Sequence, residues 1–135
     1  MPSRSVTYLV LSLALPYGST RAEDPARLTR ERVFGPEVKT GPYKHPACLE
    51  ELDNGDLYLV YYGGEGEYAT ATAVFGSRRK NGETDWSAPT PIARDPYRSV
   101  GNGVVWQAPD SLLWLFYVVR DGATWSTSRI QLKVS

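Results

Sequence analysis

Apolar and polar residues alternate in short runs over most of the chain, a pattern typical of half-buried β-strands. The clearest runs are residues 47–52 and 57–62, and the segment between them, residues 53–56, reads DNGD. Asn-Gly between two apolar runs indicates a β-hairpin because both residues tolerate the positive φ of a tight turn. The sequence therefore predicts a hairpin over residues 47–62.

Two further strands are predicted after this hairpin. A Gly-rich loop follows at residues 63–67 (GGEGE), and residues 70–77 (TATAVFGS) carry the β-branched and aromatic side chains typical of a strand. The chain turns again at residues 80–82, and a short fourth run ends at Ala93. Four consecutive antiparallel strands predict a meander.

The hairpin pattern recurs 56 positions later. Residues 54–61 (NGDLYLVY) align with residues 110–117 (DSLLWLFY), each with a turn pair followed by Leu, an aromatic residue, Leu, an apolar residue and Tyr. A sheet of four short strands cannot bury both faces alone, so such a repeat predicts stacked blades of a β-propeller. We therefore expect an all-β fold, a propeller fragment of about two four-stranded antiparallel blades. The alternative is two similar hairpins in a β-sandwich.

Residues 1–22 have the features of a secretory signal peptide. Arg4 gives a positive start, residues 6–15 (VTYLVLSLAL) are apolar, and Thr20 and Ala22 are the small residues that precede a cleavage point. The alternative is a buried helix or strand, since a membrane span needs about 20 apolar residues. We expect a secreted or periplasmic protein, with a lead-in arm at residues 23–42.

Composition and charge limit the partners. The chain has 135 residues, 41% of them apolar, which suits one globular domain. Fifteen Lys and Arg balance fifteen Asp and Glu, which argues against nucleic acid or an anionic membrane as the partner. One Cys and one His exclude an internal disulfide, a Cys-rich zinc site and a multi-histidine metal site. Carboxylates could still hold a hard cation, but we expect no cofactor.

Several motifs follow one another in an informative order: KHP at residues 44–46, YYGGEGE at 61–67, WSAP at 86–89, NGVV at 102–105 and LLWLFY at 112–117. Over residues 43–135 this order resembles the opening blades of the sialidase-like propeller family, also called the BNR or Asp-box family. The resemblance implies a partial propeller, with blade 1 at about 45–95 and an incomplete blade 2 at about 102–135. It also implies a secreted glycoside hydrolase acting on sialic acids or related sugars at the centre of a six-bladed ring.

The Asp-box itself is degenerate. The family motif S-x-D-x-G-x-T-W is matched by Ser77, Gly82, Thr84 and Trp86, but the span is two residues longer and no Asp occupies the turn. Asn81 before Gly82 suits the same left-handed turn.

The catalytic pattern of the family is incomplete. The resemblance implies a Tyr nucleophile assisted by a Glu, an Asp as acid and base, and three Arg that grip the substrate carboxylate. Glu67 matches the loop Glu and is the catalytic candidate, whereas the Asp position falls on Ala71. At the first Arg position the chain has Lys44, which keeps a cation but loses the bidentate fork. The Tyr and the other two Arg come from later blades of the family.

The candidate substrate-binding residues are Lys44, His45, Glu65 and Asn102. In a propeller the inner strands begin at the central channel, so we expect these residues and Glu67 to lie on one face at the heads of two inner strands. The alternative is a structural role for His45, a solvated loop position for the two Glu residues, and turn capping for Asn102.

Most aromatic residues are expected in the blade core: Tyr58, Tyr61, Trp86, Trp106 and Trp114. Trp125 is the one Trp whose predicted loop position suits stacking on a sugar.

Two classes of function follow. The first is a secreted sialidase-like glycoside hydrolase acting on or binding terminal sugars; the second is a non-catalytic glycan- or protein-binding propeller segment. A hydrolase or lyase of different sugar specificity is a third alternative. The lost Arg and the missing Asp favour binding without turnover for this chain. Two open blades leave an apolar face uncovered, so we expect further blades or self-association to cover it.

The leader predicts export with cleavage after Ala22. Mass spectrometry of the mature protein should identify Glu23 as its first residue. Recovery of an intact N-terminus from the cytosol would contradict this prediction.

Overall fold

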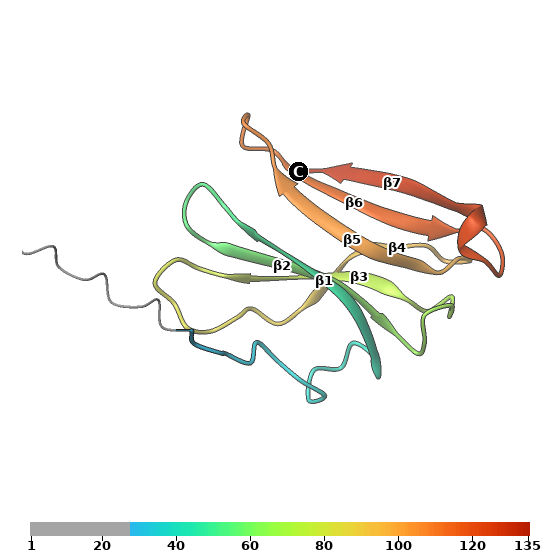
Figure 1. The fold of residues 1–135 in the computed structure, drawn as a ribbon, viewed down its shortest axis with the longest axis horizontal. Helices are drawn as coiled ribbons and strands as arrows, with labels where there is room; N and C mark the ends of the chain where they lie inside the picture. The colour runs from blue at the N-terminus through green and yellow to red at the C-terminus, as the bar shows by residue number, and fades with distance from the viewer. Residues whose placement is uncertain (1–27) are drawn as a thin grey trace, which may run out of the picture. The chain divides into compact units, whose positions relative to one another are not determined.

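The computed structural model describes residues 28–135, and the compact unit is Arg32–Ser135. The described residues form seven strands and one 3-10 turn, η1 (Trp125–Thr127) (Figure 1). The strands are β1 (Tyr43–Glu51), β2 (Leu57–Gly64), β3 (Ala73–Arg79), β4 (Thr90–Arg94), β5 (Val100–Gln107), β6 (Leu113–Arg120) and β7 (Ser128–Val134). The all-β prediction is confirmed. The predicted signal peptide, residues 1–22, lies outside the described residues, and no helix within residues 28–135 is long and apolar enough to span a membrane.

The strands form two antiparallel sheets, one in the order β1-β2-β3-β4 and one in the order β5-β6-β7. The predicted hairpin is present, and Gly55 provides the positive φ of 79° that its turn requires. The four-stranded meander is therefore confirmed. The second sheet has three strands within the described residues.

The two sheets keep the spacing of the repeat. Strand β6 begins and ends 56 positions after β2, and it occupies the same place in its sheet, next to the first strand of that sheet. The predicted repeat of one hairpin is thus a repeat of one sheet. This is the arrangement of two consecutive propeller blades.

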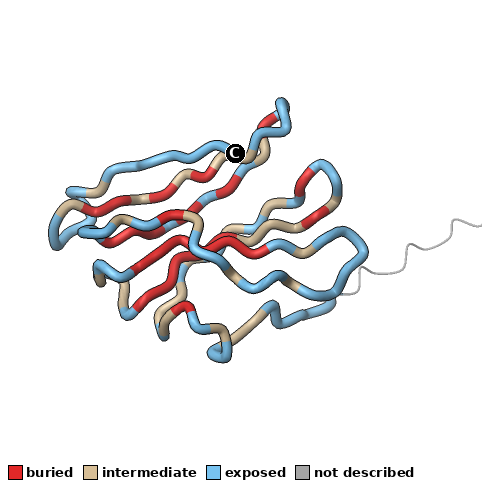
Figure 2. The backbone as a smooth tube through the Cα atoms, turned by 180° about the vertical axis from the view of Figure 1, so that it is seen from behind, coloured by how far each residue is buried: buried red, intermediate tan, exposed pale blue. Residues whose placement is uncertain are grey.

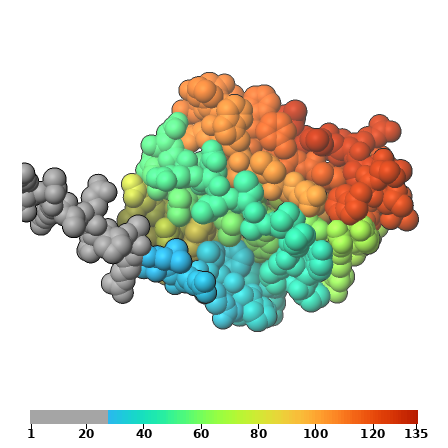
Figure 3. Space-filling model, viewed as in Figure 1, coloured from blue at the N-terminus to red at the C-terminus, as the bar shows by residue number. Residues whose placement is uncertain are grey.

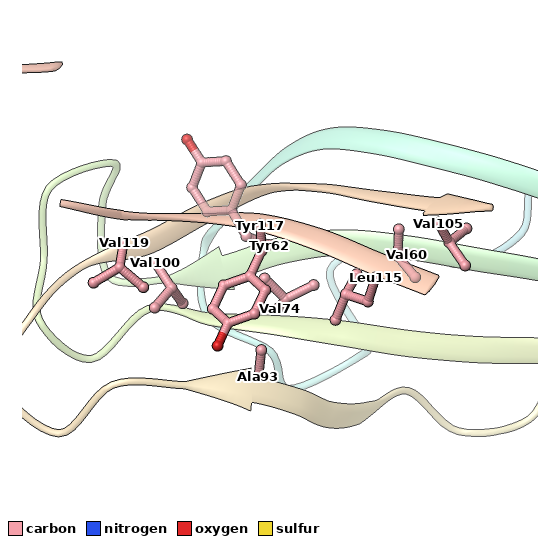
Figure 4. Packing of buried hydrophobic residues seen from close by; sticks show 9 residues of the cluster. All are labelled: Val60, Tyr62, Val74, Ala93, Val100, Val105, Leu115, Tyr117 and Val119. Carbon is pink, nitrogen blue, oxygen red and sulfur yellow. The ribbon is translucent and has the colours of Figure 1, made fainter. Parts of the chain in front are cut away.

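The core lies between the sheets (Figure 4). It consists of nine buried side chains from both sheets: Val60, Tyr62, Val74, Ala93, Val100, Val105, Leu115, Tyr117 and Val119. The second sheet approaches closely because β5 has glycine where a side chain would collide. A Cβ at Gly101 would lie 3.2 Å from the Tyr62 ring, and one at Gly103 would lie 2.8 Å from Val74. Each large buried side chain contributes about 1.5–3 kcal/mol, so sheet packing dominates the stability.

The far face of the first sheet is covered by the arm, residues 32–42. The Phe34 ring lies 5.4 Å from the Tyr61 ring, and the Thr40 hydroxyl is 3.0 Å from the Tyr61 hydroxyl. Together with Ala73 and Phe75 these residues form a second, smaller core. On the face shown in Figure 3 the arm, in blue, lies against the green strands of the first sheet.

The degenerate Asp-box at residues 77–86 has no Asp in its turn, but Asp56, from the turn between β1 and β2, bonds to that turn. Asp56 accepts the backbone N–H of Asn81 (2.8 Å) and the Nε–H of Arg78 (2.6 Å), and it is buried. The backbone hydrogen bond from Asn81 and the nearby Arg78 hold the pKa of the Asp56 carboxyl below its usual range. Comparison of residues 77–86 with the family motif did not identify Asp56, because this residue belongs to the turn of the preceding hairpin.

The lowered pKa of Asp56 predicts an acid-sensitive contribution to folding. A carboxyl group with a depressed pKa in the folded state stabilises it above its unfolded pKa, about 3.9. That contribution is lost as the pH falls below about 4 toward the folded pKa. Asp56→Asn should therefore lower the urea midpoint of unfolding at pH 7. The variant should also lose less stability than the wild type when the pH falls from 5 to about 2.5. The exposed Asp85 serves as the control, and an Asp85→Asn effect of equal size would contradict the prediction.

Candidate functional site

The candidate site is at the end of the sheets where β1 and β5 begin. These two strands lie side by side and run in the same direction, since the thiol of Cys48 is 3.8 Å from the Val105 carbonyl oxygen and Glu50 accepts the N–H of Gln107 at 3.0 Å. His45 and Asn102 each lie three residues before the first of these contacts. The structure therefore brings the heads of both strands to the same end, as the sequence predicted.

Lys44 and His45 point to opposite sides of β1. His45 pairs with Tyr62, whose ring faces the second sheet, and the two rings meet edge to face at 6.2 Å. Lys44 pairs with Gly63, and its ammonium donates to the Gly41 carbonyl at 2.8 Å, so this cation is held by the arm. His45 is exposed, and together with Lys44 it also lines a shallow pocket with Phe34 and Tyr61.

Glu65 and Glu67 are separated in the same way, although both lie in the loop between β2 and β3. Glu65 lines a shallow pocket with Thr40, Gly41 and Arg94, on the side of the arm. The backbone carbonyl of Glu67 accepts the Ser99 hydroxyl at 3.0 Å, which ties this part of the loop to the head of β5. The predicted set of five is thus not one cluster: Lys44 and Glu65 lie on the side of the arm, His45 contacts Tyr62, the Glu67 backbone is tied to Ser99, and Asn102 is exposed on β5 itself.

Asn102 lies within a β-bulge of β5, between Gly101 and Val104. Its φ of 48° is in the left-handed region, which Asn tolerates better than most residues. Asn102 is exposed between two buried glycines, in phase with the exposed Val104 and Trp106 of the same strand. The exposure of Trp106 corrects the expectation that this residue lies in a blade core. Asn102 therefore lies on the face of β5 that points away from the core.

Buried hydroxyl groups join the loop to the second sheet. Thr72 donates to the Ser99 hydroxyl at 3.2 Å and accepts the N–H of Val100 at 2.9 Å. Thr72 and Ser99 are 1% and 6% exposed, so these hydrogen bonds are shielded from water. The loop that carries Glu67 is consequently fixed relative to β5.

Arg120, at the end of β6, bridges two loops through hydrogen bonds, an arrangement called the Arg120 clasp below. It is 6% exposed, and it donates from Nη2 to the Tyr68 carbonyl and from Nε to the Gly122 carbonyl, both at 3.0 Å. Its guanidinium lies 3.9 Å from the centre of the Tyr68 ring and 5.8 Å from that of Trp125. The two rings meet edge to face at 5.9 Å. One buried cation therefore holds an aromatic pair contributed by both sheets.

The charged groups at this end include an ion-paired Asp121 and a buried Arg120. Asp121 is paired with both Arg98 (3.1 Å) and Arg129 (3.3 Å), whereas Arg120 has no carboxylate partner within residues 28–135. Burial raises the pKa of the Tyr62 hydroxyl.

The arrangement combines groups that bind polar rings. Tyr68 and Trp125 are 50% and 39% exposed, which leaves ring surface for stacking, and His45, Glu67 and Asn102 offer an imidazole, a carboxylate and an amide from the same end. Across residues 28–135 there is no cluster of three or more potential metal ligands.

Sequence analysis indicated Trp125 but missed Tyr68, Ser99 and Arg120. An Arg at the end of an apolar strand looks like an ordinary surface residue in sequence. Its contacts, Tyr68 and Gly122, come from two loops whose approach depends on how the sheets pack.

Removal of the Arg120 clasp should loosen both loops. We expect Arg120→Met to lower the free energy of unfolding by about 1–3 kcal/mol because two hydrogen bonds from a buried charged group to loop carbonyls are lost. Amide hydrogen exchange over residues 66–72 and 121–127 should accelerate more than in Arg98→Met, which changes a half-exposed Arg at the same end. Equal exchange rates in the two variants would contradict the role of Arg120 in holding the two loops together.

Comparison with known proteins identifies the family. A model of the BNR repeat-like domain matches residues 55–135, which is more than half of the chain and includes β2 through β7. Neither a curated protein nor a solved structure matches the chain. The matched region begins in the turn of the first hairpin and contains both loops clasped by Arg120. The chain belongs to the BNR repeat-like domain family, as its resemblance to sialidase-like propellers implied.

Proposed function

We propose that this chain is the sugar-binding part of a secreted, sialidase-like glycoside hydrolase domain, and that it binds terminal sugars such as sialic acids at the heads of β1 and β5. The observation that carries the proposal is the Arg120 clasp. It holds the Tyr68 and Trp125 rings next to the loop that carries Glu67.

Each component has a role in this proposal. The apolar face of a pyranose ring stacks on an aromatic side chain, and Tyr68 and Trp125 have exposed ring surface. Sugar hydroxyl groups donate to a carboxylate or an amide oxygen, for which Glu67 and Asn102 are the candidates. The Arg120 charge behind the rings attracts the carboxylate of an acidic sugar.

Turnover requires more than these groups provide. Retaining sialidase chemistry uses a Tyr nucleophile with a Glu and a separate acid. Here Ala71 stands at the position expected for the acid, and Lys44 replaces the first Arg. We therefore propose binding without hydrolysis for the isolated chain, with Glu67 as the catalytic candidate within a complete domain. The alternative, a non-catalytic segment that binds glycans or proteins, has the same surface and is separated by the test below.

The two loop carboxylates give a matched test. The indole resonance of Trp125 should shift on titration with N-acetylneuraminic acid, and Glu67→Gln should weaken binding about tenfold because a charged hydrogen-bond acceptor is lost. Glu65→Gln, in the same loop but on the side of the arm, should leave the affinity unchanged.

A parallel assay with a fluorogenic sialoside should show no hydrolysis. If no sialic acid or neutral sugar shifts the Trp125 resonance, the sugar-binding proposal is wrong. If the wild-type chain hydrolyses the sialoside and Glu67→Gln abolishes that activity, the isolated chain is a catalyst and the proposal of binding without hydrolysis is wrong.

A further inference from the structure

All three Asn residues of this chain, Asn54, Asn81 and Asn102, are followed by Gly. An Asn-Gly pair deamidates without an enzyme. The backbone nitrogen of the Gly attacks the side-chain carbonyl carbon of the Asn and closes a succinimide ring, and the amide nitrogen leaves as ammonia with the proton of the Gly N–H. Water then opens the ring to aspartate or isoaspartate. Gly favours ring closure because it has no side chain beside the attacking nitrogen.

The folded structure decides which of the three pairs reacts. The Gly N–H must be free of a hydrogen bond, the Asn side chain must reach solvent, and the peptide between the two residues must be able to rotate. The three pairs differ in each of these respects.

Both reacting groups of Asn54-Gly55 are engaged in the turn between β1 and β2. The Gly55 N–H donates to the Leu52 carbonyl at 2.7 Å. The side-chain oxygen of Asn54 accepts the N–H of Asp56 at 3.1 Å. Ring closure would break both hydrogen bonds, so the fold protects this pair.

The Asn102-Gly103 pair is protected by packing. Asn102 is exposed, but Gly103 is buried. A Cβ at Gly103 would lie 2.8 Å from the Val74 side chain and 3.6 Å from that of Val60, so the backbone there lies directly against the core. Rotation of the peptide for ring closure would disturb this contact between the sheets.

The Asn81-Gly82 pair has neither form of protection. Both residues are exposed, in the loop between β3 and β4 that Figure 2 shows mostly in pale blue. Apart from the two chain neighbours of Gly82, no atom lies within 4 Å of the place of a Cβ there. Within residues 28–135 the Gly82 N–H makes no hydrogen bond, because the turn is closed by the Glu83 N–H, which donates to the Lys80 carbonyl at 3.0 Å. The attacking nitrogen is therefore free.

The side chain of Asn81 is held by one long hydrogen bond. Its Nδ2 donates to the Asn54 carbonyl at 3.3 Å, between two exposed residues. This distance is beyond the usual range for an N–H···O hydrogen bond, so the amide is weakly restrained. The side-chain carbonyl can therefore turn toward the Gly82 nitrogen.

Deamidation at this position would act on the turn that Asp56 holds. The Asp56 carboxylate accepts the N–H of Asn81 at 2.8 Å, and it is buried. An aspartate or isoaspartate at residue 81 places a second carboxylate next to it, and like charges repel. Isoaspartate also lengthens the backbone by one carbon atom inside the turn. Both products therefore disfavour the closed loop of the degenerate Asp-box.

We propose that Asn81 is the principal site of spontaneous deamidation in the folded chain, and that its conversion to aspartate or isoaspartate destabilises the turn bonded to Asp56. The reaction consumes one water and releases one ammonia. It is a modification of the blade closure and is independent of sugar binding.

Peptide mapping by mass spectrometry tests the first part on the full chain, incubated folded at mildly alkaline pH. A deamidated peptide gains about 1 Da. The Asn81 peptide should convert about 5–30 times faster than the Asn54 peptide, because at Asn54 two hydrogen bonds must open first. The chain unfolded in urea is the control, and there the three peptides should convert at similar rates.

A pair of variants tests the second part. Asn81→Asp, which reproduces one product, should lower the urea midpoint of unfolding at pH 7 because it adds a charge beside Asp56. Thr84→Asp adds the same charge to an exposed residue of the same loop and should leave the midpoint close to that of the wild type.

Two results in the folded chain would overturn the site. The first is conversion of the Asn54 or Asn102 peptide as fast as that of the Asn81 peptide. The second is an Asn81 peptide that stays intact when folded but converts in urea. Equal urea midpoints for Asn81→Asp and Thr84→Asp would overturn the effect on the turn.

Discussion

Close packing of the second sheet on the first positions everything else in this protein. It depends on the contact of the buried Tyr62 ring with Gly101, where any side chain on β5 would collide with the ring. The apolar core gains most of its buried area from this approach, and two irregular features, the bulge at Asn102 and the bulge at Pro46, lie beside it. A small residue in one strand thus sets the distance between two sheets.

The same approach creates the candidate site. Thr72, Ser99 and Arg120 are polar groups buried at the junction. The Thr72 and Ser99 hydroxyls bond to each other, Thr72 also accepts the N–H of Val100, and Arg120 donates from Nη2 to the Tyr68 carbonyl. Buried polar groups are costly when unpaired, so their pairing fixes the loops more specifically than apolar contacts do. Tyr68 and Trp125 therefore meet as a consequence of packing between the blades.

The first blade also shows how a degenerate motif keeps its structural role. The turn that normally contains an Asp has Asn81 instead, and the carboxylate of Asp56 bonds to it from the neighbouring hairpin. Ser77 remains, and its hydroxyl donates to the Ser87 carbonyl at 2.6 Å. The hydrogen bonds that close the blade are thus retained while the position of the acid in the sequence has changed.

The sequence by itself determined the local elements and their order. Alternating apolar residues and the Asn54-Gly55 turn specify the first hairpin, and its recurrence after 56 residues specifies the second sheet, because these are short-range properties of the chain. The heads of the inner strands, with His45 and Asn102, followed from the same repeat.

Only the tertiary structure decided which of these side chains share a surface. Lys44 and His45 are neighbours in sequence but have different partners, the Gly41 carbonyl and the Tyr62 ring, and Glu65 lies on the side of the arm whereas the Glu67 backbone is tied to the head of β5. Arg120 is 52 residues from Tyr68, and Asp56 is 25 from Asn81. Contacts over such separations arise from sheet packing and turn-to-turn hydrogen bonds, for which no local pattern in the sequence is a guide.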